Sequence, residues 1–155
     1  MSWEVSTPFL ESDLEDKYLL DQDFKEQLSW KKLDIEKNGL INISRTYGIK
    51  EKKNTVFAKV IIHSDKKQSK KMNFGFSSRV KVFLNDKLLF SGQDVFRSRD
   101  YRFLGTMGFY DDVYLQLNKG RNELCMAVSE DLQFKGGWGY KSKIENRDGI
   151  NIETK

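Results

Sequence analysis

The stretch that decides the fold is residues 79–92, which read R-V-K-V-F-L-N-D-K-L-L-F-S-G. In its first half, apolar Val80, Val82 and Leu84 occupy every second position, which is the period of a strand with one buried face. Asn85-Asp86 then supplies residues that tolerate positive φ, and the apolar pattern resumes after them. The stretch therefore predicts a β-hairpin closed by a tight turn.

The same pattern recurs further along the chain. Residues 113–117 alternate in the same way, stop at Asn118-Lys119-Gly120 and resume at Leu124, which predicts a second hairpin. Residues 55–62 are nearly all apolar, as expected of a central strand that is covered on both faces. Short strands separated by turns, with no long interior helix, predict an all-β sandwich. Further strands are expected at residues 40–44, 72–76, 87–90, 123–128 and 138–144.

The chain has the length of a single domain, at 155 residues. Residues 31–146 are expected to form the sandwich, residues 1–30 an N-terminal arm packed on it, and residues 147–155 a short frayed tail. Within the arm, Ser12 and Glu15 have the spacing of a helix capping box. The sequence leaves two structures possible for this arm: one or two short helices, or an extended segment that lies across the sandwich.

Basic and acidic side chains nearly balance: the chain has 27 lysine and arginine residues and 23 aspartate and glutamate residues, which leaves a formal charge of +4. The two signs are interspersed, which is typical of a solvated surface and gives no reason to expect a nucleic acid partner. No run of about 18 apolar residues occurs, so no membrane insertion is expected. The first residues lack the form of a signal peptide, as in a cytosolic protein or a piece of a longer secreted one. Localisation therefore stays open.

Residues that carry common enzyme chemistry are scarce in this chain. His63 is the only histidine and Cys125 the only cysteine, which excludes multi-histidine zinc sites, thiolate zinc sites and an intrachain disulfide. Residues 75–79 begin like the nucleophile elbow of a hydrolase, but Arg79 stands where the second glycine is required. A protein without enzymatic activity is therefore expected, and a pair of carboxylates acting as a glycoside hydrolase is the enzymatic alternative.

Three stretches resemble a known family. Residues 82–92 resemble the strand, Asn-Gly-Lys, strand hairpin of galactose-binding-domain-like jelly rolls, although Asp86 stands in place of the usual glycine. Residues 113–128, which read V-Y-L-Q-L-N-K-G-R-N-E-L-C-M-A-V, are similar to the strand, Lys-Gly-x-Asn, strand hairpin of the same family. Gly136-Gly137-Trp138-Gly139 resembles the entry to its final strand. The resemblance covers residues 30–144.

These jelly rolls include the sugar-binding domains attached to family 2 glycoside hydrolases and many carbohydrate-binding modules. The resemblance implies a jelly-roll β-sandwich that serves as a non-catalytic binding or accessory module, with no cofactor and no catalytic residue. A structural calcium ion is frequent in such modules.

Residues 93–112 interrupt the rhythm of strands with a long, charged and aromatic segment. Arginine and carboxylate side chains form bidentate hydrogen bonds with vicinal hydroxyls, and an aromatic ring packs against the apolar face of a sugar. Loops of this length are often functional. The alternative is that the rings of this segment enter the core and that Arg99 and Asp100 form a structural ion pair. The candidate ligand-binding residues here are Arg97, Arg99, Asp100, Tyr101 and Arg102.

Two further groups of residues are candidates for a site. Trp138 and Tyr140 share one face of the last expected strand, either as a stacking platform for a ligand or as the core face of that strand. The neighbouring carboxylates Asp111 and Asp112 are candidate ligands for a structural calcium ion. By contrast, the lysine-rich residues 65–71 predict a solvated turn.

The sequence therefore predicts a non-catalytic binding or accessory module whose favoured partner is a carbohydrate. A structural module that packs against a partner protein domain or a missing catalytic domain is the second hypothesis. A carboxylate-dependent glycoside hydrolase is the third.

Overall fold

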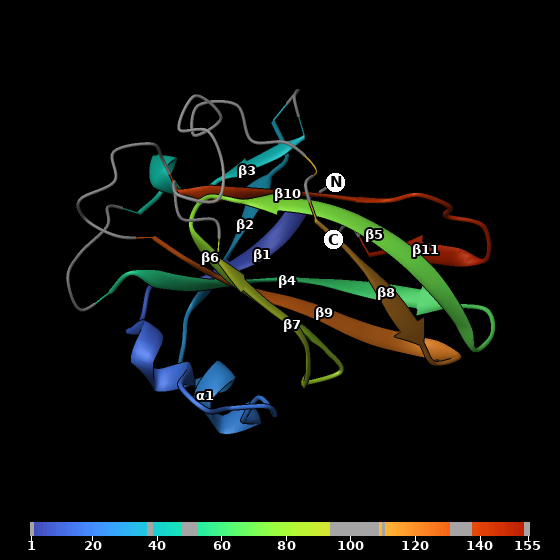
Figure 1. Ribbon diagram of the computed structural model, residues 1–155, viewed down its shortest axis with the longest axis horizontal. Helices are drawn as coiled ribbons and strands as arrows, with labels where there is room; N and C mark the ends of the chain where they lie inside the picture. Colours follow the sequence, from blue (N-terminus) through green and yellow to red (C-terminus); the bar gives the residue numbers. More distant parts are fainter. Residues whose placement is uncertain are drawn as a thin grey trace.

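The protein is an all-β sandwich of two antiparallel sheets (Figure 1). The computed structural model describes residues 2–36, 39–47, 53–93, 109, 111–130 and 138–153. The seven-stranded sheet contains β1 (Ser2–Ser6), β2 (Trp30–Asp34), β4 (Thr55–Ser64), β6 (Arg79–Leu84), β7 (Lys87–Gln93), β9 (Gly120–Ser129) and β11 (Ile150–Ile152). The four-stranded sheet contains β3 (Leu40–Asn42), β5 (Gln68–Phe76), β8 (Asp111–Leu117) and β10 (Gly139–Ile144).

The chain winds back and forth between the two sheets. The order of strands is β2-β1-β4-β9-β6-β7 in the larger sheet, with β11 also on β4, and β3-β10-β5-β8 in the smaller one. From β4 to β10 every connection changes sheet except that between β6 and β7, which is the winding of a jelly roll. The expected fold class is therefore confirmed.

Helices are short in the described residues. They are the 3₁₀ turns η1 (Glu11–Leu14) and η2 (Ile43–Arg45) and the α-helix α1 (Gln22–Glu26), which begins where Asp21 Oδ1 accepts a hydrogen bond from Asp23 N. In this described part of the chain, no helix combines the length and the apolar character needed to cross a bilayer.

The hairpin predicted from residues 79–92 is confirmed as β6 and β7. Asn85 and Asp86 both adopt positive φ, at 50° and 68°, which is the conformation of a two-residue turn between twisted strands. Val80, Val82 and Leu84 point into the sandwich and are at most 5% exposed. The alternation in the sequence therefore marks the buried face of β6 correctly.

The second predicted hairpin was wrong, because β8 and β9 belong to different sheets. Residues 118–120 form a corner between the sheets, in which Gly120 has a φ of 95° that other residues rarely adopt. Asn122 holds this corner with a fully buried side chain: its Oδ1 accepts from Asn118 N at 2.9 Å and its Nδ2 donates to Asn118 O at 2.8 Å. In this chain the Lys-Gly-x-Asn pattern therefore marks a change of sheet and not a hairpin.

Two hydrophobic cores stabilise the fold. The larger lies between the sheets and includes Trp3, Trp138 and Tyr140. The smaller lies on the outer face of the seven-stranded sheet, where Phe9, Leu14 and Leu20 of the N-terminal segment cover Phe57, Phe83, Cys125 and Ala127. Strand β4 therefore contributes to both cores, which confirms the expectation that its two faces are covered. Burial also raises the pKa of the Cys125 thiol, as expected of a small core residue.

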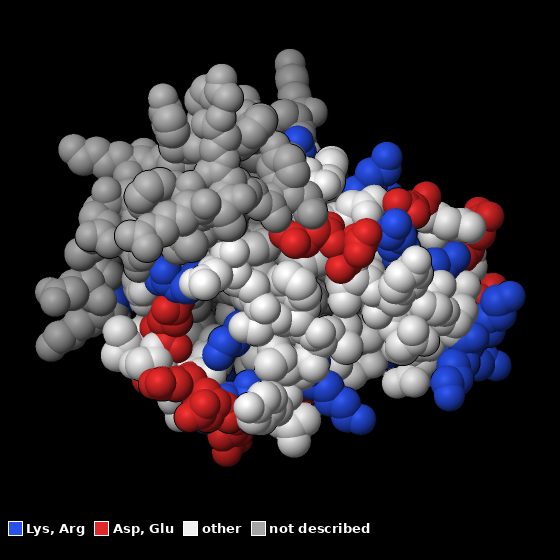
Figure 2. Space-filling model, viewed as in Figure 1, with Lys and Arg blue, Asp and Glu red and all other residues white. Residues whose placement is uncertain are grey.

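Residues 7–30, which we call the N-terminal layer, lie across the seven-stranded sheet on the side away from β5 (Figure 1). The layer is tied down by Lys25, whose Nζ bonds Asp86 Oδ1 at 2.5 Å and Glu123 Oε1 at 2.9 Å. Acidic side chains gather at this end of the molecule (Figure 2). The exposed acidic residues of the layer are Asp13, Glu15, Asp16, Asp21, Asp23 and Glu26.

Both ends of the chain differ from the prediction. The N-terminal arm begins with a full strand, because β1 pairs with β2 on one side and β4 on the other. The tail is not frayed over its described residues, because β11 pairs with β4 from Ile150 to Ile152. The lysine-rich turn is also shorter than expected, because Lys70 lies within β5 and is only 7% exposed.

Candidate functional site

The arginine-rich group predicted from the sequence lies outside the described residues. This applies to Arg97, Arg99, Asp100, Tyr101 and Arg102, which follow β7 in the chain. Their role as ligand-binding residues stays a prediction.

Trp138 and Tyr140 are core residues, so the expectation of a stacking platform is corrected for both. Their side chains are 1% and 0% exposed, and Trp138 Nε1 donates to Val128 O at 3.1 Å. The Tyr140 ring packs edge to face against the Trp3 ring, with 5.1 Å between the ring centres. A ring enclosed on both sides offers no face to a sugar, and burial also raises the pKa of Tyr140 well above its ordinary value.

Asp111 and Asp112 do not act together on one ion. They occupy successive positions in β8, and successive side chains of a strand point to opposite faces. Asp112 lies 3.4 Å from Lys71 Nζ instead. Among the described residues, no group of three or more histidine, cysteine, aspartate or glutamate side chains is placed to hold a metal ion.

An open cleft of about 570 Å³ lies where η1 overhangs the outer face of β6, β7 and β9. We call it the η1 cleft. It is lined by Glu11, Ser12, Leu14, Glu15, Arg79, Val80, Lys81, Ser91, Gly92, Gln93, Ala127 and Ser129.

The register of three strands builds the floor of the η1 cleft. Arg79 stands opposite Gln93 on β7 and Ser129 on β9, while Lys81 stands opposite Ser91. Residues directly opposite each other share a face of the sheet, so these polar side chains project together on the outer face. Ser129 is fixed by a 2.6 Å hydrogen bond between its hydroxyl and that of Thr55.

The roof of the cleft is η1, which two contacts hold against the floor. Arg79 Nε donates to both carboxylate oxygens of Glu11, at 3.0 and 2.7 Å. Lys81 Nζ donates to the carbonyl oxygen of Leu14 at 2.8 Å. The cleft therefore holds a neutralised ion pair beside an ammonium group and the exposed carboxylate of Glu15.

The chemistry of the η1 cleft is that of polar recognition. Guanidinium, ammonium, amide and hydroxyl groups supply donors, and carboxylate, amide and hydroxyl groups supply acceptors. None of the described residues that line it is aromatic. Gln93, on its floor, is the residue directly before the segment that contains Arg97 to Arg102. The predicted loop and the cleft thus adjoin in the chain.

Sequence reasoning missed this cleft although part of its signal was present. Arg79 and Lys81 are the polar positions of the alternating stretch, so the sequence marks them as lying on the outer face of β6. Glu11 and Glu15 carry no comparable signal, because their place in the cleft depends on how the N-terminal layer packs.

Comparisons with solved structures find similar folds. A β-glucosidase from Kluyveromyces marxianus matches 98% of this chain and 17% of its own, with a TM-score of 0.53 and 12% identity. An anti-sigma factor domain-containing protein matches 98% of this chain and 44% of its own, with a TM-score of 0.52 and 12% identity. A family 35 carbohydrate binding module from an environmental isolate matches 66% of this chain and 73% of its own, with a TM-score of 0.44 and 11% identity.

Sequence comparisons add nothing to these matches. No protein-family model matches the chain, and no curated protein does. The chain spans less than half the length of the β-glucosidase and of the anti-sigma factor domain-containing protein. At such identities the structural similarity concerns the fold, a two-sheet antiparallel sandwich with a short helix near its N-terminus.

Proposed function

We propose that this protein is a non-catalytic carbohydrate-binding module that holds a short glycan in the η1 cleft. The observation that carries the proposal is the set of polar side chains that the register of β6, β7 and β9 projects into one open cleft. Sugar hydroxyls both donate and accept hydrogen bonds, and this cleft offers both kinds of partner over its floor and roof.

Three features support recognition of a glycan over catalysis. The Glu11 carboxylate is neutralised by Arg79, which suits a fixed acceptor better than a proton donor. The resemblance of residues 82–92 and 113–128 is to sugar-binding jelly rolls. The β-glucosidase that shares the fold is matched over 17% of its own length, which suits an accessory domain beside a catalytic one. A module of this kind works by holding its ligand near a partner domain.

A glycan array followed by calorimetric titration tests the proposal. The Ser91→Ala/Gln93→Ala double variant removes exposed polar groups from the cleft floor, and Gln27→Ala is the matched control, since Gln27 is exposed on the N-terminal layer and does not line the cleft. Loss of one or two neutral hydrogen bonds weakens binding about tenfold, which corresponds to about 1.4 kcal/mol. Equal affinity of the double variant and the control, or no glycan bound at all, would contradict the proposal.

One observation favours a second candidate function. Glu11 and Glu15 both line the η1 cleft, and paired carboxylates are the usual machinery of glycoside hydrolysis. We therefore include an assay for release of reducing sugar from every glycan that binds. If the protein hydrolysed a glycan and Glu15→Gln abolished that hydrolysis, the protein would be an enzyme and not a non-catalytic binding module.

A further inference from the structure

The two outer faces of the sandwich differ in how they are covered. The N-terminal layer packs on the outer face of the seven-stranded sheet and forms the smaller core there. The outer face of the four-stranded sheet carries Tyr114, which is 58% exposed, together with the half-exposed carboxylates of Asp112 and Glu145. This second face leaves a large aromatic ring in solvent among ordered polar groups.

The register of β8, β5 and β10 arranges these side chains in rows across the sheet. Tyr114 stands opposite Lys71, and the backbone of Glu145 bonds that of Lys71 on the other side. One row further along, Asp112 stands opposite Asn73, and Lys143 stands opposite Asn73 in turn. Rows on the same face are about 7 Å apart, because side chains alternate along each strand.

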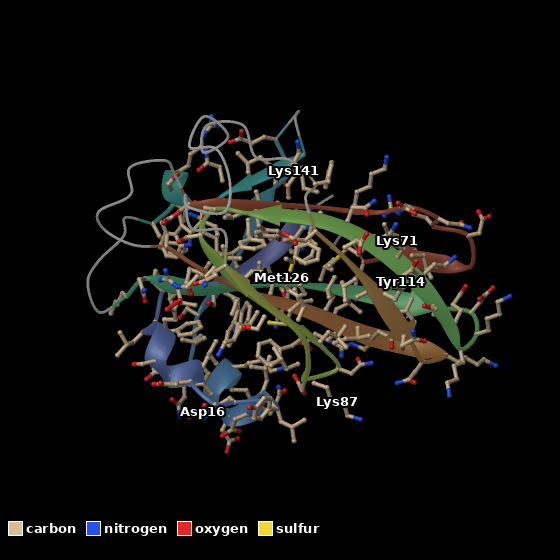
Figure 3. All side chains as sticks on the ribbon, in the orientation of Figure 1. Asp16, Lys71, Lys87, Tyr114, Met126 and Lys141 are labelled. Carbon is tan, nitrogen blue, oxygen red and sulfur yellow. The ribbon has the colours of Figure 1, made fainter. Side chains whose placement is uncertain are left out.

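The polar groups of this face are held in place by one another. Lys71 Nζ lies 3.4 Å from Asp112 Oδ2 and 3.8 Å from Glu145 Oε1, so it bridges the two neighbouring strands. Asn73 Nδ2 donates to the same Glu145 oxygen at 2.8 Å. Figure 3 shows Lys71 and Tyr114 side by side on β5 and β8, with Asp16 of the N-terminal layer at the far side of the molecule.

A second exposed ring lies beside the same face. Phe109 is 44% exposed, and Lys141 Nζ of β10 lies 5.0 Å from the centre of its ring. Lys141 stands opposite Gly75 of β5, two positions along from Asn73 and therefore on the same side of the sheet. The face thus has an aromatic ring at Tyr114, a polar network next to it and another ring beside Lys141.

We infer that this outer face is a second binding surface, on which an extended polysaccharide chain lies across β8, β5 and β10 with one sugar ring stacked on Tyr114. The inference takes its ligand class from the proposed function, but it concerns a separate surface and a longer ligand. Stacking on a ring uses the apolar face of a sugar, and the fixed network beside it offers donors and acceptors to the hydroxyls of neighbouring units.

A polysaccharide fits this surface better than a protein partner does. An extended peptide adds to the free edge of a sheet through its backbone, whereas these side chains project from the face. A protein hot spot needs a compact apolar centre, and the described outer positions next to Tyr114 are Lys71, Gln116 and Asp112. The polar majority of the face suits a ligand rich in hydroxyls.

The test uses the full chain and compares polymers with short oligosaccharides. Affinity electrophoresis in gels that contain xylan, mixed-linkage β-glucan or galactomannan measures retardation by long chains. We expect Tyr114→Ala to weaken retardation at least fivefold and Tyr114→Phe to preserve it, because stacking needs the ring and not the hydroxyl. Tyr18→Ala is the matched control, since Tyr18 is 70% exposed on the N-terminal layer.

The outcomes separate this inference from the proposed function. Weaker retardation in Tyr114→Ala but not in Ser91→Ala/Gln93→Ala supports the second surface, whether or not the η1 cleft binds a short glycan. Retardation that Tyr114→Ala leaves unchanged, or the absence of retardation in all three gels, overturns the inference. Sedimentation showing a dimer that Tyr114→Ala disperses would also overturn it, because the face would then be a protein interface.

Discussion

Asn85 donates a hydrogen bond of 2.9 Å from its Nδ2 to the Oδ1 of Asn122, so the turn between β6 and β7 is bonded to the corner between β8 and β9. The Asn85 side chain also accepts from Glu123 N at 2.9 Å through its own Oδ1. The two turns that the sequence marks most clearly are therefore one connected structure at the same end of the sandwich.

Replacing Asn122 with alanine should lower the free energy of unfolding by about 3 kcal/mol, because buried backbone groups at the corner lose their partners. Chemical denaturation measures this change. Asn118→Ala is the control, since Asn118 contributes backbone groups to the corner and its side chain is exposed. Equal stability of the two variants would show that the corner does not depend on the Asn122 amide.

Lys25 should make stability depend on alkaline pH. Its side chain is 4% exposed; burial alone would lower its pKa, but hydrogen bonds to Asp86 and Glu123 outweigh burial and raise the pKa above 10.5. A folded-state pKa above that of the unfolded chain means that the stabilisation is present below about pH 10.5 and is lost as the pH rises through the folded value.

Urea denaturation between pH 8 and pH 12 tests this dependence. At pH 8, Lys25→Met should cost about 3 kcal/mol, because breaking a buried ion pair leaves its carboxylates uncompensated. The difference between wild type and variant should shrink toward pH 12. Arg45→Met is the control, since Arg45 is 74% exposed in its pair with Glu36 and should change stability by less than about 1 kcal/mol. A difference that stays constant with pH would contradict the assignment.

Phe9 should contribute as much to stability as a residue of the main core. Its ring is 6% exposed, and the centre of the ring lies 4.6 Å from that of Phe57 and 5.2 Å from that of Phe24. Phe9→Ala should therefore cost about 3–4 kcal/mol in thermal or chemical unfolding. The neighbouring Leu10→Ala serves as control, because Leu10 is 36% exposed and should cost under about 1 kcal/mol. If Phe9→Ala lowered the free energy of unfolding as little as Leu10→Ala does, the N-terminal layer would pack only weakly on the sheet.

Tyr140→Phe should raise stability by about 1 kcal/mol. The Tyr140 hydroxyl is buried and has no hydrogen-bond partner among the described residues, so its removal relieves a desolvation cost. Glycan binding should stay unchanged, because the ring lies in the core. A destabilised Tyr140→Phe variant would show that the hydroxyl has a partner in solution.

Much of the fold is predictable from local alternation. Val80, Val82 and Leu84 face the core, and Asn85-Asp86 forms the expected turn, because a strand and its tight turn are specified by neighbouring residues. The β8–β9 corner was mistaken for a hairpin because a glycine-containing turn does not reveal which sheet the next strand joins. Strand β1 was missed because five residues carry too little pattern, and its position comes from pairing with distant β2 and β4.

The candidate site was harder to predict than the fold. Trp138 and Tyr140 share a face in the sequence, but a core face and a ligand platform have the same two-residue period. The η1 cleft joins Glu11 to Arg79 across the chain, and no spacing rule connects positions so far apart. The alternation of residues 113–117 places Tyr114 on the outer face of β8, but the sequence does not show which polar side chains of β5 and β10 surround it.

Strand β4 also determines how the two ends of the chain relate. Both β11 and β1 pair antiparallel with β4. The pairing of β11 ends at Ile62 and that of β1 begins at Lys59, so only Val60 and Ile61 of β4 lie between the two paired segments. The last strand therefore points along the edge of β4 toward the start of the first, which brings the last described residue, Glu153, toward the first, Ser2 (Figure 1). A short linker between them would leave the hydrogen-bonded order intact, so the jelly roll is suited to circular permutation and to insertion within a surface loop of another protein.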